Sequence, residues 1–253
     1  MIQYPINSRV VPQEDNRAVF EIAPLYPGYG TTIGNVLRRV LVSSIEGSAI
    51  VSVKMKGVDH EFTTIPNVLE DVAVIIMNLK KVRFKMFKDE PITLALSVKG
   101  QKEVTAKDIK TTADIEIINQ NQKIATITDK KGELELELII ERGVGYVPVE
   151  QRQKEKLTVG EIAIDAIFSP IQVVNFTVEN MRVGQRTDYN KVLLEISTDG
   201  SISPEDAFKR ANDILIEHFQ TMNRIVDDGS SEIEEKIKAE ESEEIKDKDS
   251  KKK

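Results

Sequence analysis

Two periodicities run through this 253-residue chain, and together they limit it to a mixed architecture. In several stretches apolar residues alternate with polar ones, which indicates β-strands that turn one face toward a core. Only three stretches show the spacing of an amphipathic helix. Strands with few intervening helices favour antiparallel pairing, so the sequence predicts an α+β fold. The predicted strands lie at residues 19–22, 49–55, 92–98, 134–140, 174–178 and 192–196.

The first predicted helix spans residues 32–46 and follows a glycine-rich loop. Thr31 or Thr32 is expected to cap its start, and Gly47 to end it in the left-handed conformation. At 100° per residue, the side away from its apolar stripe carries Asn35, Arg39, Val42 and Glu46. Because arginine is enriched at binding hot spots, Arg39 is predicted to anchor a protein partner.

The second predicted helix begins at Asn67, where Glu70 would complete a capping box. It ends near Lys80 and Lys81, whose charges suit the carboxyl end of a helix. Apolar residues cover most of its circumference, so we expect it to be largely buried.

The third predicted helix has the strongest start signal, with Ser203 as cap and Pro204 in the first turn. It continues for about 22 residues, or roughly 33 Å. A helix that long and apolar needs a partner, and a second copy of the chain is the obvious one. Its stripe comprises Ala207, Phe208, Ala211, Ile214, Leu215, His218, Phe219, Met222 and Ile225.

Composition and motifs exclude most kinds of active site. There are no cysteines and only two histidines, which removes thiolate chemistry and histidine-rich metal sites. His60 stands between Asp59 and Glu61, but successive strand residues point to opposite faces and cannot converge on one ion. His218 is expected to pack at a helix interface. No apolar run is long enough to span a membrane.

The loop from Gly28 to Gly34 leaves two interpretations open. Its glycines could cradle a phosphate at a helix start, as in a dinucleotide-binding enzyme. Its G-x-G-x-x-x-G spacing departs from that fingerprint, and the favoured interpretation is a tight turn that lets the helix pack closely. A third hypothesis is a sheet-based adaptor. The net charge of −7 and the absence of a basic run give little support for wide contact with nucleic acid.

Several blocks, taken in order, closely resemble the bacterial RNA polymerase alpha subunit family over about residues 22–222. The blocks are PLYPGYGTTIGNVLRRVL at 24–41, GVDHEF at 57–62, ED at 70–71, NLK at 78–80, ERGVGYVP at 141–148, DAIFSP at 165–170 and VGQRTDY at 183–189. Several independent blocks make the resemblance specific, whereas the glycine loop alone would be weak.

The resemblance implies a dimerisation domain of antiparallel sheet plus two helices, with an inserted, mostly-β domain. It assigns residues 1–46 and 170–226 to the dimerisation domain and 47–169 to the insert. Residues 227–253 form a charged tail that is too poor in apolar residues to order itself. Two chains would pair, and the implied dimer contacts are Ile33, Leu37, Val40, Leu41, Phe208, Ala211, Leu215, His218, Phe219 and Met222.

The resemblance also implies that the dimer is the scaffold on which the beta and beta-prime subunits assemble, with omega and sigma in the complete enzyme. Beta would contact Asn35, Arg39 and Val42, and beta-prime would contact Lys80, Ile164, Ile171 and Lys191. The chain is therefore expected to be a non-catalytic, cytoplasmic subunit of a nucleotidyltransferase. It would have no cofactor of its own, and the catalytic magnesium belongs to beta-prime.

The sequence departs from the family at its end. Family members usually carry a C-terminal helical domain that contacts promoter DNA, and none follows the charged tail here. Direct DNA contact by this chain is accordingly not expected.

Overall fold

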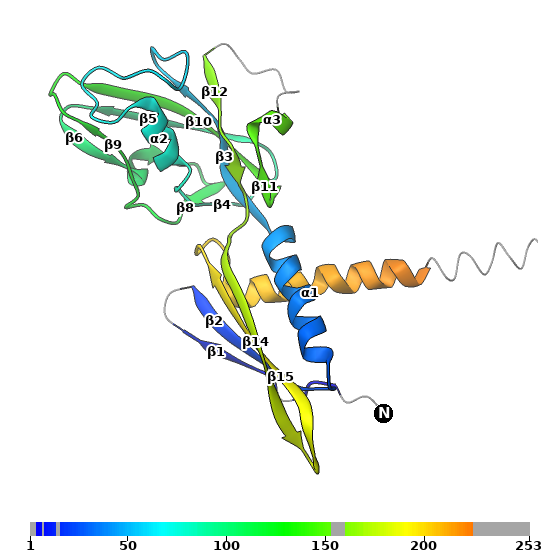
Figure 1. The fold of residues 1–253 in the computed structure, drawn as a ribbon. Coiled ribbons are helices and arrows are strands. Elements are labelled where there is room, and N and C mark those ends of the chain that lie inside the picture. The colour runs from blue at the N-terminus through cyan, green and yellow to red at the C-terminus, as the bar shows by residue number, and fades with distance from the viewer. Residues whose placement is uncertain (1–3, 7, 14–15, 153–159, 225–253) are drawn as a thin grey trace, which may run out of the picture. The chain divides into compact units, whose positions relative to one another are not determined.

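The computed structural model describes residues 4–6, 8–13, 16–152 and 160–224, and the predicted α+β class is confirmed (Figure 1). Residues up to Phe208 belong to one compact unit, and a second unit begins at Lys209. The first unit contains two larger antiparallel sheets and the helices packed on them.

The first sheet joins segments far apart in the sequence. Its strand order is β1-β2-β15-β14, and the strands span Arg9–Pro12, Arg17–Leu25, Arg186–Thr198 and Ile171–Val183 respectively. In the register, Leu194 of β15 lies opposite Phe20 of β2 on one side and Phe176 of β14 on the other. The predicted strands at 19–22, 174–178 and 192–196 are therefore confirmed.

Helix α1 (Tyr29–Ser44) packs closely on β14 and β15 of this sheet. A Cβ added to Gly34 would lie 2.5 Å from the ring of Phe176, and one added to Gly30 would lie 2.7 Å from Val178. Only glycine leaves room for so short a separation between helix and strand. The interpretation of the glycine loop as a close-packing device is thus confirmed.

Both predicted ends of α1 were wrong. Thr31 and Thr32 lie inside the helix, which starts after Gly28 in the left-handed conformation (φ 86°). Its amino end is capped from β15 instead, where Asn190 Oδ1 accepts the N–H groups of Gly28 (2.8 Å) and Gly30 (3.3 Å). At the other end Ile45 is already extended, and Gly47 lies within a strand.

The second sheet has the order β12-β3-β10-β5-β7. Its strands span Glu161–Ala163, Glu46–Met55, Glu133–Val144, Ile92–Lys99 and Ile109–Lys110 respectively. The central strand β10 turns Leu134, Leu136 and Leu138 into the core while Glu137 faces solvent, as its alternation predicted. Helix α2 (Val72–Leu79) covers this core, and Val72, Ile75 and Leu79 are fully buried.

Strand β3 departs from the expected pattern, in which one face of a strand is exposed to solvent. Its middle is buried on both sides, because Ala49 and Val51 belong to a second small cluster with Ala166 and Phe168. Ile50 and Val53 belong to the main core on the other side. An interior strand that is covered on both faces needs no polar alternation.

The predicted start of α2 was also wrong. The helix begins at Val72, five residues after the expected cap Asn67, which has a positive φ of 63°. Glu70 does not complete a capping box, because its carboxylate accepts the backbone N–H (2.6 Å) and the hydroxyl (3.0 Å) of Thr126. Burial raises the pKa of Glu70, but the bonds from Thr126, together with the nearby Lys123, lower it overall.

Three two-stranded ladders and two short helical segments complete the described part of the first unit, and none was predicted. The ladders are β4 (Phe84–Met86) with β8 (Ile115–Ile117), β6 (Lys102–Thr105) with β9 (Lys123–Ile127), and β11 (Tyr146–Val147) with β13 (Ala166–Ile167). The helical segments are a 3-10 turn at Ala106–Asp108 and α3 (Val149–Arg152). Strands of two to five residues are too short to show a period.

The third predicted helix covers residues 204–224 of the described chain. Its start is as predicted, since Ser203 Oγ accepts the N–H of Asp206 at 3.1 Å. Ile225 and the predicted tail at 227–253 lie outside the described residues. The division into a dimerisation domain (1–46 and 170–226) and an insert (47–169) stays a prediction.

Candidate protein-interaction surfaces

The outer side of α1 carries the three residues predicted to contact beta. Asn35, Arg39 and Val42 are all exposed, with 48% of Val42 accessible. The amide of Asn35 donates to the carbonyl of Thr31 at 3.0 Å, which holds that side chain along the helix. Several described arginines form ion pairs, whereas Arg38 and Arg39, which are neighbours in the sequence, have no acidic partner among the described residues.

The inner side of α1 corrects part of the predicted dimer contact. Leu37 (3% exposed) and Leu41 (fully buried) pack inside the chain and offer a partner no side-chain surface. Ile33 and Val40 flank them and are half-buried. The apolar stripe of α1 therefore serves the sheet of its own chain.

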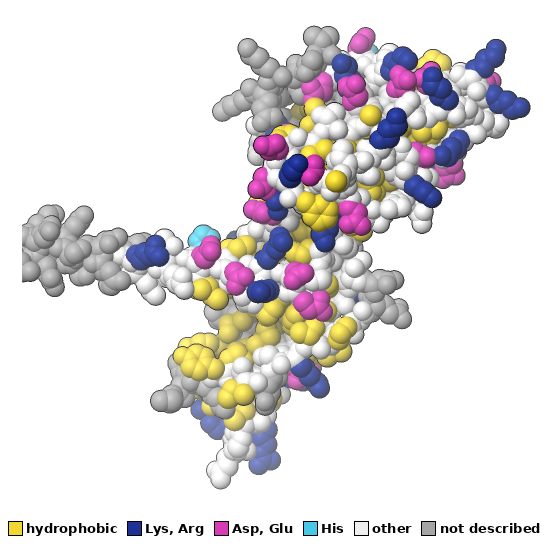
Figure 2. Space-filling model, turned by 180° about the vertical axis from the view of Figure 1, so that it is seen from behind, with side chains coloured by type: hydrophobic (Ala, Val, Ile, Leu, Met, Phe, Trp, Pro, Cys, Tyr) yellow, Lys and Arg dark blue, Asp and Glu magenta, His cyan; other side chains and the backbone are white. Residues whose placement is uncertain are grey.

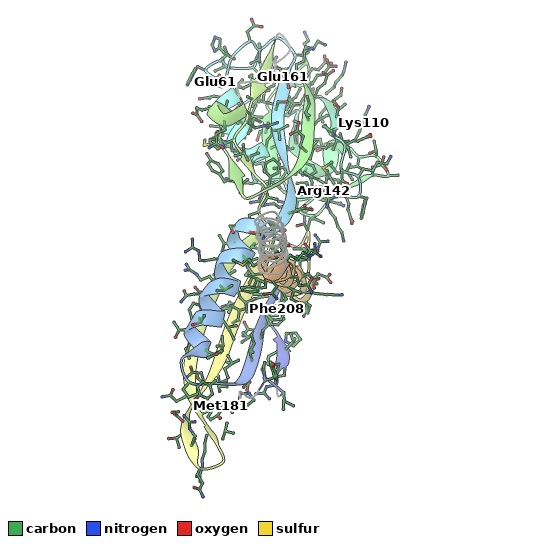
Figure 3. The ribbon with its side chains drawn as sticks, turned by 90° about the vertical axis from the view of Figure 1, so that its right-hand side faces the viewer. Glu61, Lys110, Arg142, Glu161, Met181 and Phe208 are labelled. Carbon is green, nitrogen blue, oxygen red and sulfur yellow. The ribbon has the colours of Figure 1, made fainter. Side chains whose placement is uncertain are left out.

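The helix at 204–224 becomes steadily more exposed along its length. Phe208, which is labelled in Figure 3, belongs to the first unit. Its ring stacks on that of Phe20 with ring centroids 4.5 Å apart. Ala211 lies in the second unit and is 0% exposed, and its assignment to the dimer contact stays a prediction. Leu215 is half-buried. The last turns leave apolar side chains largely in solvent, namely Ile216 (52% exposed), Phe219 (58%) and Met222 (59%).

His218 lies among these exposed residues and is itself exposed. The expected packing role is therefore not fulfilled within one chain.

Two of the four predicted beta-prime contacts are buried. Ile164 is 1% exposed and belongs to the main core, and Ile171 is 9% exposed at the start of β14. These two side chains belong to the interior and present almost no surface to another protein. The correction follows from position, since Ile164 directly follows β12, Ile171 begins β14, and both side chains are buried.

The other two predicted beta-prime contacts are half-buried lysines in ion pairs. Lys80 Nζ lies 2.9 Å from Asp165 Oδ2, and the other oxygen of Asp165 accepts the N–H of Val149 at 3.1 Å. The Lys80 hydrogen bond, followed by that of Val149, lowers the pKa of Asp165. Lys191 pairs across the strands with Glu179 at 2.7 Å, and this bond raises the pKa of Lys191.

Surface charge is mixed on the face that Figure 2 draws, where acidic and basic side chains intersperse without a large patch of one sign. A hollow of about 490 Å³ on the outside of the second sheet is lined by charges of both signs, among them Lys54, Lys56, Asp59 and Glu135. Such lining selects no anion or cation in particular.

No catalytic or metal-binding constellation emerges in the described ranges. They contain no group of three histidine, aspartate or glutamate side chains that could hold a metal, and His60 is exposed. The N–H groups of Gly28 and Gly30 are already bonded to Asn190, so the loop does not offer them to a phosphate. No helix among the described residues is long and apolar enough to cross a membrane.

Comparisons with known proteins identify the family to which the chain is similar. Residues 52–169 match the family model of the RNA polymerase Rpb3/RpoA insert domain. The chain is 47% identical over 220 residues to the DNA-directed RNA polymerase subunit alpha of Moorella thermoacetica, covering 87% of this chain and 70% of that one.

Similar relatives occur in other bacteria. The subunit alpha of Symbiobacterium thermophilum is 46% identical over 229 residues (90% of this chain, 72% of the relative). That of a Roseiflexus species is 47% identical over 213 residues (84% and 65%). The chain thus spans between 65% and 72% of the length of these three relatives.

Proposed function

This chain belongs to the family of DNA-directed RNA polymerase alpha subunits, and we propose that it acts as a non-catalytic assembly subunit of that enzyme. The observation that carries the proposal is the match over most of the chain, combined with exposed apolar and arginine side chains on two helices. In this role the chain dimerises and then receives the beta and beta-prime subunits.

Dimerisation is supported by the end of the helix at 204–224. Ile216, Phe219 and Met222 are each more than half exposed. Burying such side chains against a second copy would remove apolar surface from water, which stabilises the dimer by about 25 cal/mol for each Å² buried. Phe219 and Met222 remain proposed dimer contacts, together with His218 and the half-buried Ile33, Val40, Phe208 and Leu215.

Beta binding is assigned to the outer side of α1 around Arg39, and beta-prime binding to the surfaces near Lys80 and Lys191. Arginine at the centre of an interface forms bidentate bonds to carboxylates, and its fork geometry makes such contacts strong. Lys80 and Lys191 are held by Asp165 and Glu179, so their heads have fixed positions before a partner arrives. Fixed side chains lose less conformational entropy on binding.

We further propose that the chain holds no metal or other cofactor and that the polymerase's magnesium is bound by beta-prime. Omega and sigma would join through the assembled enzyme, in the cytoplasm. DNA contact is not assigned to this chain.

The first test is the mass of the purified chain in solution. We expect a dimer at micromolar concentration, and a Phe219→Asp variant should shift toward monomer because a charge would be desolvated in the contact. A well-folded wild-type monomer would contradict the dimer.

The second test is capture of purified beta. Arg39→Ala should weaken it by more than about 1 kcal/mol, as expected for a hot-spot residue. Lys110→Ala is the matched control, since it removes an exposed charge from the edge strand β7 (Figure 3). Equal capture by both variants would remove Arg39 from the binding surface.

A further inference from the structure

An exposed apolar patch lies next to the carboxyl end of α1 and shares only Val42 with the residues assigned above to beta. We call it the Tyr146 patch. Its members and their exposed fractions are Val42 (48%), Val144 (43%), Tyr146 (58%) and Ile167 (41%).

The backbone brings these residues together at the last turn of α1. The hydroxyl of Ser169 donates to the carbonyl of Val42 at 3.4 Å, and this carbonyl is one that the helix cannot satisfy by itself. A Cβ added to Gly145 would lie 3.6 Å from the carbonyl oxygen of Ser43. Gly145 O in turn accepts the N–H groups of Phe168 (2.9 Å) and Ser169 (3.2 Å).

The β11–β13 ladder then sorts its side chains onto two faces. Tyr146 pairs with Ile167, and Val147 pairs with Ala166. Ala166 is fully buried in the small cluster to which Val147 adds, so that face is covered by the chain itself. Tyr146 and Ile167 occupy the opposite face, and directly paired side chains lie close enough to form one surface. A two-stranded ladder is marginal in water, and its apolar face gains from being covered.

We propose that the Tyr146 patch is the apolar half of the surface that binds beta, and that its occupant is an apolar segment of beta carrying carboxylates. Two observations indicate this occupant. Val42 belongs to both the patch and the outer side of α1, so the two surfaces are continuous. Arg38 and Arg39, one turn earlier on α1, are exposed cations without an acidic partner among the described residues. Their positive charge complements acidic side chains on a partner.

The inference rests on the proposed function, and the test separates the two. The 253-residue chain is titrated with purified beta in four forms: wild type, Tyr146→Ser with Ile167→Ser, Tyr146→Phe, and Phe87→Ser. Phe87 is the exposure-matched control because it is also 58% exposed and lies just after β4, outside the four residues of the patch. Circular dichroism and light scattering establish that each variant is folded and dimeric.

The double serine variant should bind beta at least about tenfold more weakly, while Tyr146→Phe, which keeps the ring, and Phe87→Ser should bind like wild type. Added salt should weaken wild-type binding more than binding of an Arg38→Gln, Arg39→Gln variant. Wild-type affinity of the double serine variant, or an equal salt response of the arginine variant, would overturn the inference and leave the scaffold role standing. Loss of the dimer in the double serine variant would show that the patch binds a second copy and would also overturn it. Failure of wild type to bind beta would overturn the proposed function itself.

Discussion

Replacing Gly47 by alanine should destabilise the first unit, because a neighbouring backbone group occupies the space of its missing side chain. Gly47 of β3 lies opposite Gly143 of β10, and Phe168 crosses over this pair of glycines. A Cβ on Gly47 would overlap the carbonyl oxygen of Phe168, whereas one on Gly143 would meet the Phe168 ring at 2.7 Å. A ring can rotate away, but a carbonyl moves only with its strand.

The magnitude follows from two opposing terms. Forcing an extra methyl into a packed site costs about 1–3 kcal/mol, and the upper end applies where backbone must shift. Replacing glycine by alanine returns about 0.4–1 kcal/mol by restricting the unfolded chain. The net loss is about 2 kcal/mol, or about 4–8 °C in Tm for a protein of this size.

Urea unfolding followed by circular dichroism measures this loss directly. The informative comparison is with Gly143→Ala, made in the wild type and in a Phe168→Ala background. Removing the ring should relieve Gly143→Ala and leave Gly47→Ala nearly as costly, a difference that a double-mutant cycle resolves. The reasoning is refuted by a Gly47→Ala variant that matches wild-type stability, or by equal relief of both variants in the Phe168→Ala background.

Two further predictions concern single hydrogen-bonding side chains. Asn190→Ala should lower the free energy of unfolding by about 1–2 kcal/mol, because it removes the cap of α1 and leaves the buried N–H of Gly30 without an acceptor. Asn190→Asp keeps an acceptor oxygen and should retain most of that stability. Equal losses for the two variants in thermal unfolding would contradict the capping role. Asp165→Asn should cost about 1 kcal/mol at pH 7, a modest value because the pair with Lys80 is partly exposed. The folded-state pKa of Asp165 is lowered, so this stabilisation is present above the ordinary carboxyl pKa and is lost as pH falls through the lowered one. A wild-type advantage that does not shrink as the pH falls below the ordinary carboxyl pKa would contradict it.

Strands were predictable from the sequence where they were long and one-sided. β10, β5 and β15 alternate over eight or more residues, and their buried positions match that alternation. The ladder of β11 and β13 gave no signal, since two residues cannot display a period.

Helix ends were predictable only when the capping group was local. Ser203 caps its own helix through a residue three positions away, and the sequence showed it. The start of α1 is capped by a side chain 160 positions away, and Glu70 is bonded to Thr126 rather than to its own helix. Local sequence rules cannot anticipate partners supplied by the tertiary fold.

The candidate surfaces were also predicted only in part. Helical geometry placed Arg39 and Val42 outward, as found. Helical geometry could not tell whether an apolar stripe faces the sheet of its own chain or a second chain. Leu37 and Leu41 were therefore assigned to the dimer contact, although they are buried within their own chain. Ile164 and Ile171 were wrongly assigned to a surface, because a resemblance in sequence shows which positions correspond but not whether their side chains are exposed.

The long-range cap on α1 has a consequence for synthesis on the ribosome. When residues 29–44 leave the exit tunnel, neither Asn190 nor strand β15 has yet been made. The strands of the second sheet lie between residues 46 and 163 and close among themselves, so they can pair while the nascent chain is still growing. Helix α1 must wait with its apolar stripe uncovered until the last strands emerge, which makes that interval the period when a chaperone is most needed.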